Sequence, residues 1–117
     1  MKAVKYSASE VKKIDLGTKQ IYKYPSPTKD MDIGRMVVKG RYPKDPSTFI
    51  IEHEVSFVIF VIKGSGKIYV GDELFEIKVG DVVFVPSENK FAVEGDMEYI
   101  TVDSPAFFPE QSEEVKV

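Results

Sequence analysis

The sequence predicts an all-β protein folded as one sandwich or barrel. Short apolar runs that suit strands recur roughly every 8–12 residues, with glycine, proline, asparagine or aspartate between them. No long segment has the 3.6-residue period of an amphipathic helix, which argues against a βαβ protein. Because 117 residues suffice for one closed core, we expect a single domain over 1–117, with the barrel core at about 33–103, an N-terminal arm at 1–32 and a C-terminal tail at 104–117.

Composition narrows the class of protein. The net charge of −3, from 16 basic and 19 acidic side chains, argues against a surface that binds nucleic acid. The absence of cysteine excludes disulfides and thiolate metal sites. No apolar run reaches the roughly 18 residues that cross a bilayer, and the first residues lack the apolar block of a secretory signal. We expect a cytoplasmic protein with neither nucleic acid nor membrane as a partner.

The sequence of the N-terminal arm predicts little regular structure. Ser7 and Glu10 have the spacing of a capping box, which predicts one short helical turn. The segment Thr18–Met31 contains Pro25 and Pro27, and proline cannot donate to a sheet ladder. We therefore expect that segment to be irregular or to lie at a sheet edge.

The first two strands are expected at residues 33–39 and 48–54. Phe57–Ile62 is six apolar residues without polar alternation, which predicts a strand buried on both faces. Gly64-Ser65-Gly66 then predicts a turn, since glycine tolerates positive φ.

Later strands are separated by recognisable turns. Gly71-Asp72 has the composition of a two-residue hairpin between alternating segments at 67–70 and 73–79. Further turns are expected at 79–81, 86–89 and 94–96, which leave strands at 82–85, 90–93 and 97–102. The tail is expected to wrap the barrel and then fray.

Two spaced motifs indicate a family. The first pattern has positions for a glycine, a His-x-His pair, a glutamate and a final glycine. When the final glycine is placed on Gly64, the His-x-His and glutamate positions fall on the strand before it. Gly80 and Pro86 match the start of a second pattern, which continues with a glycine, a histidine and an asparagine. Residues from about 50 to 103 therefore resemble the cupin superfamily. This resemblance implies a double-stranded β-helix, the jelly-roll barrel of cupins.

The same resemblance assigns the four metal-ligand positions of cupins to Ile51, His53, Phe57 and Phe91. A mononuclear site for Zn, Fe or Mn needs about three or four nitrogen or oxygen donors. The chain has one histidine, and strand alternation directs Glu52 away from it. We therefore expect no metal and no other cofactor.

His53 allows two interpretations. It could act inside the barrel as a lone general base or as a hydrogen-bond donor to a ligand, because its ordinary pKa of about 6.5 suits proton transfer near neutrality. The other interpretation is a relic, with the imidazole bonded to a backbone carbonyl or exposed at the rim of the barrel. Catalysis would require an orienting partner, for which Tyr42, Tyr99 and Asp103 are candidates, and we name His53 and Tyr99 as the candidate catalytic residues.

Ile51, His53, Phe57 and Phe91 are the candidate ligand-binding residues. The rings of Phe57 and Phe91 either fill the barrel interior or line an apolar pocket.

An outer apolar stripe is expected on the sheet. If Phe57 points inward, then Val58, Phe60 and Ile62 point outward. Such a face needs a cover, either the chain's own termini or a second copy. We expect a homodimer.

The function expected from these observations is a metal-independent cupin-domain protein that binds a sugar or carboxylate, or serves as an accessory module. One alternative is a metal-free enzyme similar to the cupin isomerases and epimerases of sugars and nucleotide sugars, with His53 as the base. A second alternative is a structural or regulatory subunit that docks a partner through the apolar sheet face. The sequence leaves open whether the protein is an enzyme.

Overall fold

Nine strands and two short 3-10 turns make up the computed structural model, which describes residues 1–117. The turns are η1 (Ala8–Glu10) and η2 (Pro109–Gln111). The strands are β1 (Lys12–Asp15), β2 (Lys19–Lys23), β3 (Asp32–Tyr42), β4 (Thr48–Glu52), β5 (Ser56–Val70), β6 (Glu73–Lys78), β7 (Val82–Val85), β8 (Lys90–Ser104) and β9 (Ser112–Lys116). The predicted all-β jelly roll is confirmed. Neither helical turn has the length or apolarity to cross a membrane.

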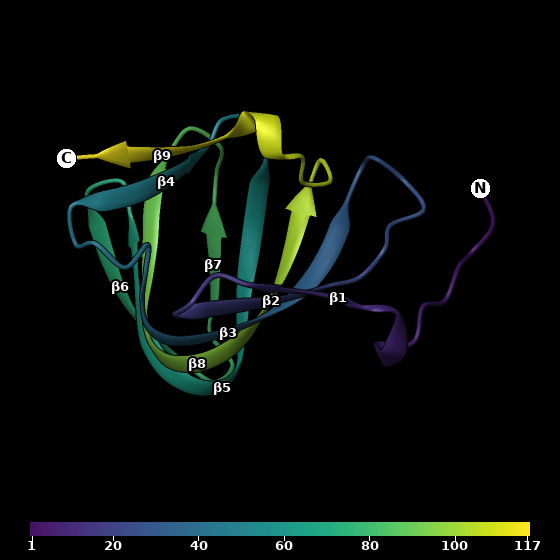
Figure 1. Ribbon diagram of the computed structural model, residues 1–117, viewed down its shortest axis with the longest axis horizontal. Helices are drawn as coiled ribbons and strands as arrows, with labels where there is room; N and C mark the ends of the chain where they lie inside the picture. The colour runs from purple at the N-terminus through teal and green to yellow at the C-terminus, as the bar shows by residue number, and fades with distance from the viewer.

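The strands form one antiparallel sheet that curls on itself (Figure 1). Its main path runs β1-β2-β3-β8-β4-β9, and β5 joins it by pairing with β8 while also pairing with β6 and β7. Strands β3, β8 and β5 bend together to make the floor of the curl in Figure 1, and β4 with β9 makes its roof. The β1–β2 hairpin crosses one side and closes part of the interior.

The two longest strands run straight through the glycines at which turns were expected. The predicted turns at Gly64–Gly66 and at residues 94–96 are therefore wrong, because β5 and β8 continue past both and Gly66 pairs with Gly95. A Cβ atom on Gly95 would lie 2.6 Å from the Cα of Gly66, and one on Gly66 would collide with the carbonyl oxygen of Glu94. These glycines permit two bent strands to approach closely. The hairpin at Gly71-Asp72 is confirmed.

Strand β5 separates an inner from an outer face. Phe57, Ile59 and Val61 are buried, whereas Phe60 and Ile62 are exposed by 43% and 38%. The prediction that this strand is buried on both faces is wrong for the single chain. The outward stripe that strand alternation predicted is present, with Phe60 and Ile62 exposed and Val58 half-buried. The inner face joins residues of β3 and β8 in a core of 14 buried side chains.

Both chain ends carry more structure than their composition predicts. The capping box of Ser7 and Glu10 forms, around a single turn. Strand β2 lies between β1 and β3, so part of the segment expected to be irregular is an interior strand. The prediction of a fraying tail is also wrong, because β9 pairs along the whole of β4. Buried Gln111 anchors the tail, since its side-chain oxygen accepts the N–H groups of Glu54 and Val55 at 3.0 and 3.2 Å.

Candidate functional site

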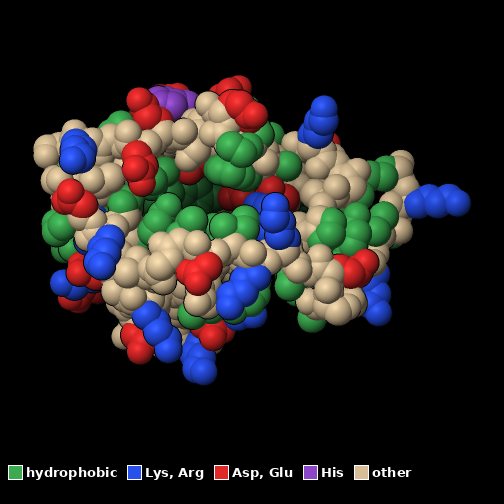
Figure 2. Space-filling view, viewed as in Figure 1, with side chains coloured by type: hydrophobic (Ala, Val, Ile, Leu, Met, Phe, Trp, Pro, Cys, Tyr) green, Lys and Arg blue, Asp and Glu red, His purple; other side chains and the backbone are tan.

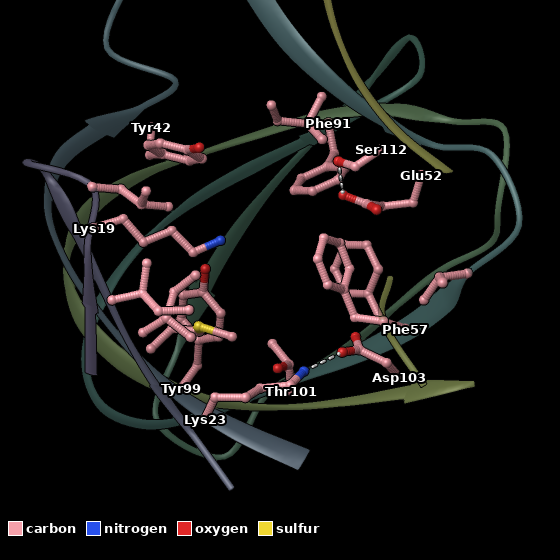
Figure 3. Close-up of a pocket in the computed structure, with 17 residues that line it drawn as sticks. Lys19, Lys23, Tyr42, Glu52, Phe57, Phe91, Tyr99, Thr101, Asp103 and Ser112 are labelled. Atoms are coloured by element: carbon pink, nitrogen blue, oxygen red, sulfur yellow. Dashed lines mark hydrogen bonds and ion pairs between the residues drawn. The ribbon is translucent and has the colours of Figure 1, made fainter. Parts of the chain in front are cut away.

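The curl of the sheet encloses a cavity of about 220 Å³. Figure 2 shows it as a hollow on the face of the molecule turned toward the viewer, with apolar side chains inside and charged groups at its edge. Figure 3 shows the side chains that line it. Most of them are apolar, and the ionisable or hydroxyl-bearing ones are Lys19, Lys23, Tyr42, Glu52, Tyr99, Thr101, Asp103 and Ser112.

Two of the expected ligand-binding residues form one wall of this cavity. The rings of Phe57 and Phe91 meet edge to face, with centroids 4.8 Å apart and an interplanar angle of 65°. Phe57 comes from β5 and Phe91 from the start of β8, and both are buried. The rings line the cavity and leave it open beside them. The motif spacing therefore located both of these positions correctly.

The other two expected residues lie outside the cavity. On β4, Ile50 and Glu52 are buried and line the cavity, whereas Ile51 is only half-buried and does not line it. The pairing of Ile50 with Phe91 sets this orientation. His53 follows the strand and is likewise absent from the cavity lining. The expectation that Ile51 points into the barrel is therefore wrong, because a shift of one residue along a strand reverses the face. Of the two interpretations of His53, the position inside the barrel is wrong, and the structure agrees with a residue outside the cavity.

His53 instead ties the tail to a turn on the outside. Its side chain is 40% exposed, with Nδ1 3.0 Å from a carboxylate oxygen of Glu88 and Nε2 2.8 Å from one of Glu113. Hydrogen bonds to Glu113 and Glu88 raise the pKa of the imidazole above its ordinary value. The two ring nitrogens are thus both engaged on the surface.

Lys19 is the most unusual side chain in the cavity. Strand β2 curls over the interior, so that alternate residues Lys19, Ile21 and Lys23 line it. Lys19 is only 9% exposed, and it forms no ion pair. Its Nζ lies 5.1 Å from the ring centroid of Tyr42. Burial lowers the pKa of Lys19 to about 8, although Glu52 and Asp103 partly oppose this shift.

Lys23 is held by two carboxylates. Its Nζ lies 2.7 Å from Asp32 and 3.0 Å from Asp103. The N–H of Phe107 donates to the other oxygen of Asp32 at 2.8 Å, which attaches the tail to this cluster. Burial and the hydrogen bond with Asp32 raise the pKa of Asp103 to about 7. Burial opposes ionisation of Asp32, but its hydrogen bonds to Asp103, Lys23 and the Phe107 N–H outweigh this and lower its pKa.

Hydroxyl groups from β8 complete the polar part of the site. Tyr99 and Thr101 alternate with Asp103 on the inner face of this strand. Burial raises the pKa of Tyr99 well above its ordinary value, so its hydroxyl stays protonated. Thr101 is 4% exposed, and its Oγ1 has no hydrogen-bond partner. In Figure 3 the polar ends of Lys19 and Tyr99 point toward the same part of the cavity.

The sequence predicted three possible partners for His53, namely Tyr42, Tyr99 and Asp103. All three line the cavity, whereas His53 does not reach it. Lys19 and Lys23 were missed. The alternation of lysine, isoleucine and lysine at 19, 21 and 23 was the available signal for an inward-facing polar strand.

The cavity does not fit the metal that the cupin fold implies. No three His, Asp or Glu side chains are grouped so that they could hold a metal ion. The cavity-lining carboxylates already have partners, because Glu52 accepts from Gln111 Nε2 and from Ser112 Oγ at 2.9 Å while Asp103 contacts Lys23. Lys19 also places an ammonium group beside them, which repels a cation.

Comparison with known proteins gives a family and several structural relatives. The family model described as the cupin domain of mannose-6-phosphate isomerase matches residues 45–104. No curated protein matches the chain. Streptomyces PAC13, in a Tyr-to-Phe variant with uridine, is 20% identical with a TM-score of 0.88, over 99% of this chain and 93% of that one. Another structure of this protein is described as that of a nucleoside dehydratase.

Two more distant structures show the same fold. KdgF from a Halomonas species is 17% identical with a TM-score of 0.69, over 89% of this chain and 94% of that one. An RmlC-like cupin from Shewanella frigidimarina is 18% identical with a TM-score of 0.70, over 86% of this chain and 89% of that one. At these identities the likeness concerns the fold.

Proposed function

The chain belongs to the cupin superfamily through the mannose-6-phosphate isomerase cupin-domain family, and from this premise we propose that its barrel cavity is a metal-independent site for a small hydroxylated molecule. The observation that carries the proposal is Lys19, a cavity-lining cation without an anionic partner. A buried ammonium group without a partner is unfavourable unless something else compensates it. A ligand oxygen would supply that compensation.

The rest of the lining supports the same class of ligand. Thr101 presents an unpaired hydroxyl and Tyr99 a protonated one. The carboxylates of Glu52 and Asp103 also line the cavity, and each has acceptor sites beyond those that its present partners use. Mixed donors and acceptors beside an aromatic wall suit a sugar or a sugar acid. The volume of about 220 Å³ lies below the roughly 300–1,000 Å³ of pockets for drug-sized ligands, which favours a molecule of about one ring. The structural relative solved with uridine holds a larger hydroxylated ligand, in which a ribose ring is joined to a pyrimidine ring.

A thermal-shift screen tests the proposal. Sugars, sugar acids and nucleosides are added to the wild type, to Lys19→Met and to His53→Ala, which serves as a matched control outside the cavity. A ligand that binds the folded state raises the melting temperature. We expect a stabilising ligand to act on the wild type and His53→Ala and not on Lys19→Met. Equal stabilisation of all three proteins would place the ligand elsewhere. Added Zn, Fe or Mn is expected to leave the melting temperature unchanged.

A catalytic role is the second candidate, and it is favoured by two groups that titrate near neutrality in one cavity. Asp103 has a pKa of about 7 and Lys19 one of about 8. Such values suit a general acid and base. This proposal differs from the isomerase-like alternative with His53 as base, since Asp103 takes that role. Exchange of a ligand C–H for deuterium, followed by NMR in D₂O with wild type and Asp103→Asn, distinguishes catalysis from binding alone.

The expected homodimer and the docking role remain proposals. They are supported by the outer face of β5 and β7, where Phe60, Ile62, Val82 and Phe84 are exposed by 43%, 38%, 48% and 77%. The cytoplasmic location and the exclusion of nucleic acid and membrane as partners likewise remain predictions from composition.

A further inference from the structure

We propose that Lys19 is a carbonyl-reactive amine, which forms a covalent imine with an aldehyde or ketone held in the cavity. This inference rests on the proposed function, because the cavity must admit a small molecule. It adds that the ligand carries a carbonyl carbon and that the carbon is placed at Nζ of Lys19.

The two lysines of the cavity provide an internal comparison. Lys23 is fixed between Asp32 and Asp103, at 2.7 and 3.0 Å, so its Nζ is engaged in two ion pairs. Lys19 lies four residues away on the same face of β2, forms no such pair and is more deeply buried. Its amine faces the open volume beside the Tyr42 ring. Of the two, only Lys19 is available to attack a bound molecule.

The protonation state of Lys19 agrees with this geometry. Imine formation requires the neutral amine. With a pKa of about 8, roughly a tenth of Lys19 is neutral at pH 7, against about one in three thousand for a lysine at the ordinary value of 10.5. Burial in the apolar lining is the cause, and burial has the same effect in enzymes whose lysines act as nucleophiles.

The chemistry balances without any oxidant, reductant or metal. The lone pair of Nζ forms a bond to the carbonyl carbon, and the carbonyl π electrons move to its oxygen, which takes up a proton. The nitrogen then loses one proton, which gives a neutral carbinolamine. A second proton on its hydroxyl lets the C–O bond break, so that one water leaves and the nitrogen lone pair forms the C=N bond of an iminium ion. Loss of the remaining N–H proton gives the imine. Tyr99 keeps its proton and can donate to the carbonyl oxygen, and Asp103 lines the same cavity as a proton source. The Tyr42 ring stabilises a cationic iminium in the position that the ammonium group occupies.

Reductive trapping tests the inference. The full chain is incubated at pH 7 with glycolaldehyde and sodium cyanoborohydride, which reduces an iminium ion to a stable secondary amine, and the modified lysines are identified by peptide mapping. Exposed Lys39 serves as the reference within the same molecule. We expect Lys19 to be labelled at least about tenfold faster than Lys39, because its neutral fraction is much larger. Labelling of Lys19 no faster than Lys39 would overturn the inference.

Variants distinguish this inference from the proposed function. Lys19→Arg keeps the positive charge and cannot form an imine, and Lys39→Arg is the matched surface control. The rapid label should disappear in Lys19→Arg and persist in Lys39→Arg; a rapid label that persists in Lys19→Arg would contradict the inference. The thermal shift reports on binding separately. If ligands stabilise the wild type but Lys19 is not labelled rapidly, the inference fails and the proposed function stands. If Lys19 is labelled rapidly but no sugar, sugar acid or nucleoside stabilises the protein, the cavity admits a carbonyl compound and the inference stands, whereas the proposed class of hydroxylated ligand fails.

Discussion

Replacing Lys19 by methionine should make the protein more stable. The folded state lowers the pKa of Lys19 from 10.5 to about 8, and a difference of one in pKa corresponds to about 1.4 kcal/mol. Keeping this side chain charged therefore costs the folded protein about 3 kcal/mol at neutral pH. Methionine has a similar length and no charge, and it suits a mostly apolar lining. We expect Lys19→Met to raise the free energy of unfolding by about 3 kcal/mol, or the melting temperature by roughly 10 °C.

The lowered pKa of Lys19 determines how the extra stability of Lys19→Met changes with pH. Between pH 8 and pH 10.5 the unfolded wild type binds more protons at Lys19 than the folded one, so the stability of the wild type rises with pH in that window. The advantage of the methionine variant is therefore full below pH 8 and declines toward pH 10.5. Urea denaturation of both proteins at pH 7 and at pH 10 measures it, with Lys39→Met as an exposed control that should change little. A variant no more stable than the wild type, or an advantage independent of pH, would refute the reasoning.

Three other predictions concern the fold and the surface. His53→Ala should lower stability at pH 5.5 and leave it unchanged at pH 8.5, because a raised pKa stabilises the folded state only while the imidazole is charged; urea midpoints at the two pH values decide this. Gly66→Ala should lower the free energy of unfolding by more than about 2 kcal/mol, because the new Cβ would collide with the backbone of β8. Gly34→Ala is the control and should be tolerated, because the nearest atoms to its Cβ are 3.4 Å away. Thermal unfolding compares the two variants, and equal effects would contradict the close approach of β5 and β8. Light scattering should show a dimer that Phe84→Glu dissociates, and a monomeric wild type would contradict this expectation.

Local patterns predicted the parts of the fold that depend on neighbouring residues. The Gly71-Asp72 hairpin follows from turn chemistry, and the outward stripe beside Phe57 follows from the two-residue period of a strand. The glycines of β5 and β8 were misinterpreted because their role lies across the sheet. Gly66 faces Gly95, 29 positions further along the chain in the paired register. Nothing near Gly66 in the sequence distinguishes that role from a turn.

The candidate site was predicted only in part for a related reason. Motif spacing located Phe57 and Phe91, and the search for a partner of His53 named Tyr99 and Asp103. The residues of β4 predicted to face the cavity were displaced by one position along the strand. A displacement of one residue reverses the face, and His53 therefore lies outside the cavity. Lys19 was missed because its burial depends on the β1–β2 hairpin folding over the interior. The alternation at 19, 21 and 23 indicates an inward face only once that arrangement is known, and Pro25 and Pro27 had favoured an irregular segment.

Direct titration of the Lys19 amine is the measurement that tests most directly whether the barrel encloses an unpaired, buried lysine. The Nζ signals of the chain labelled with ¹⁵N-lysine can be followed by NMR against pH, and Lys19→Met assigns the signal that belongs to this residue. We predict a pKa of about 8 in the free protein, and a change in that signal when a stabilising ligand is added. A Lys19 that titrates at the ordinary lysine value, and does not respond to any ligand, would contradict the claim that the barrel encloses an unpaired, desolvated amine.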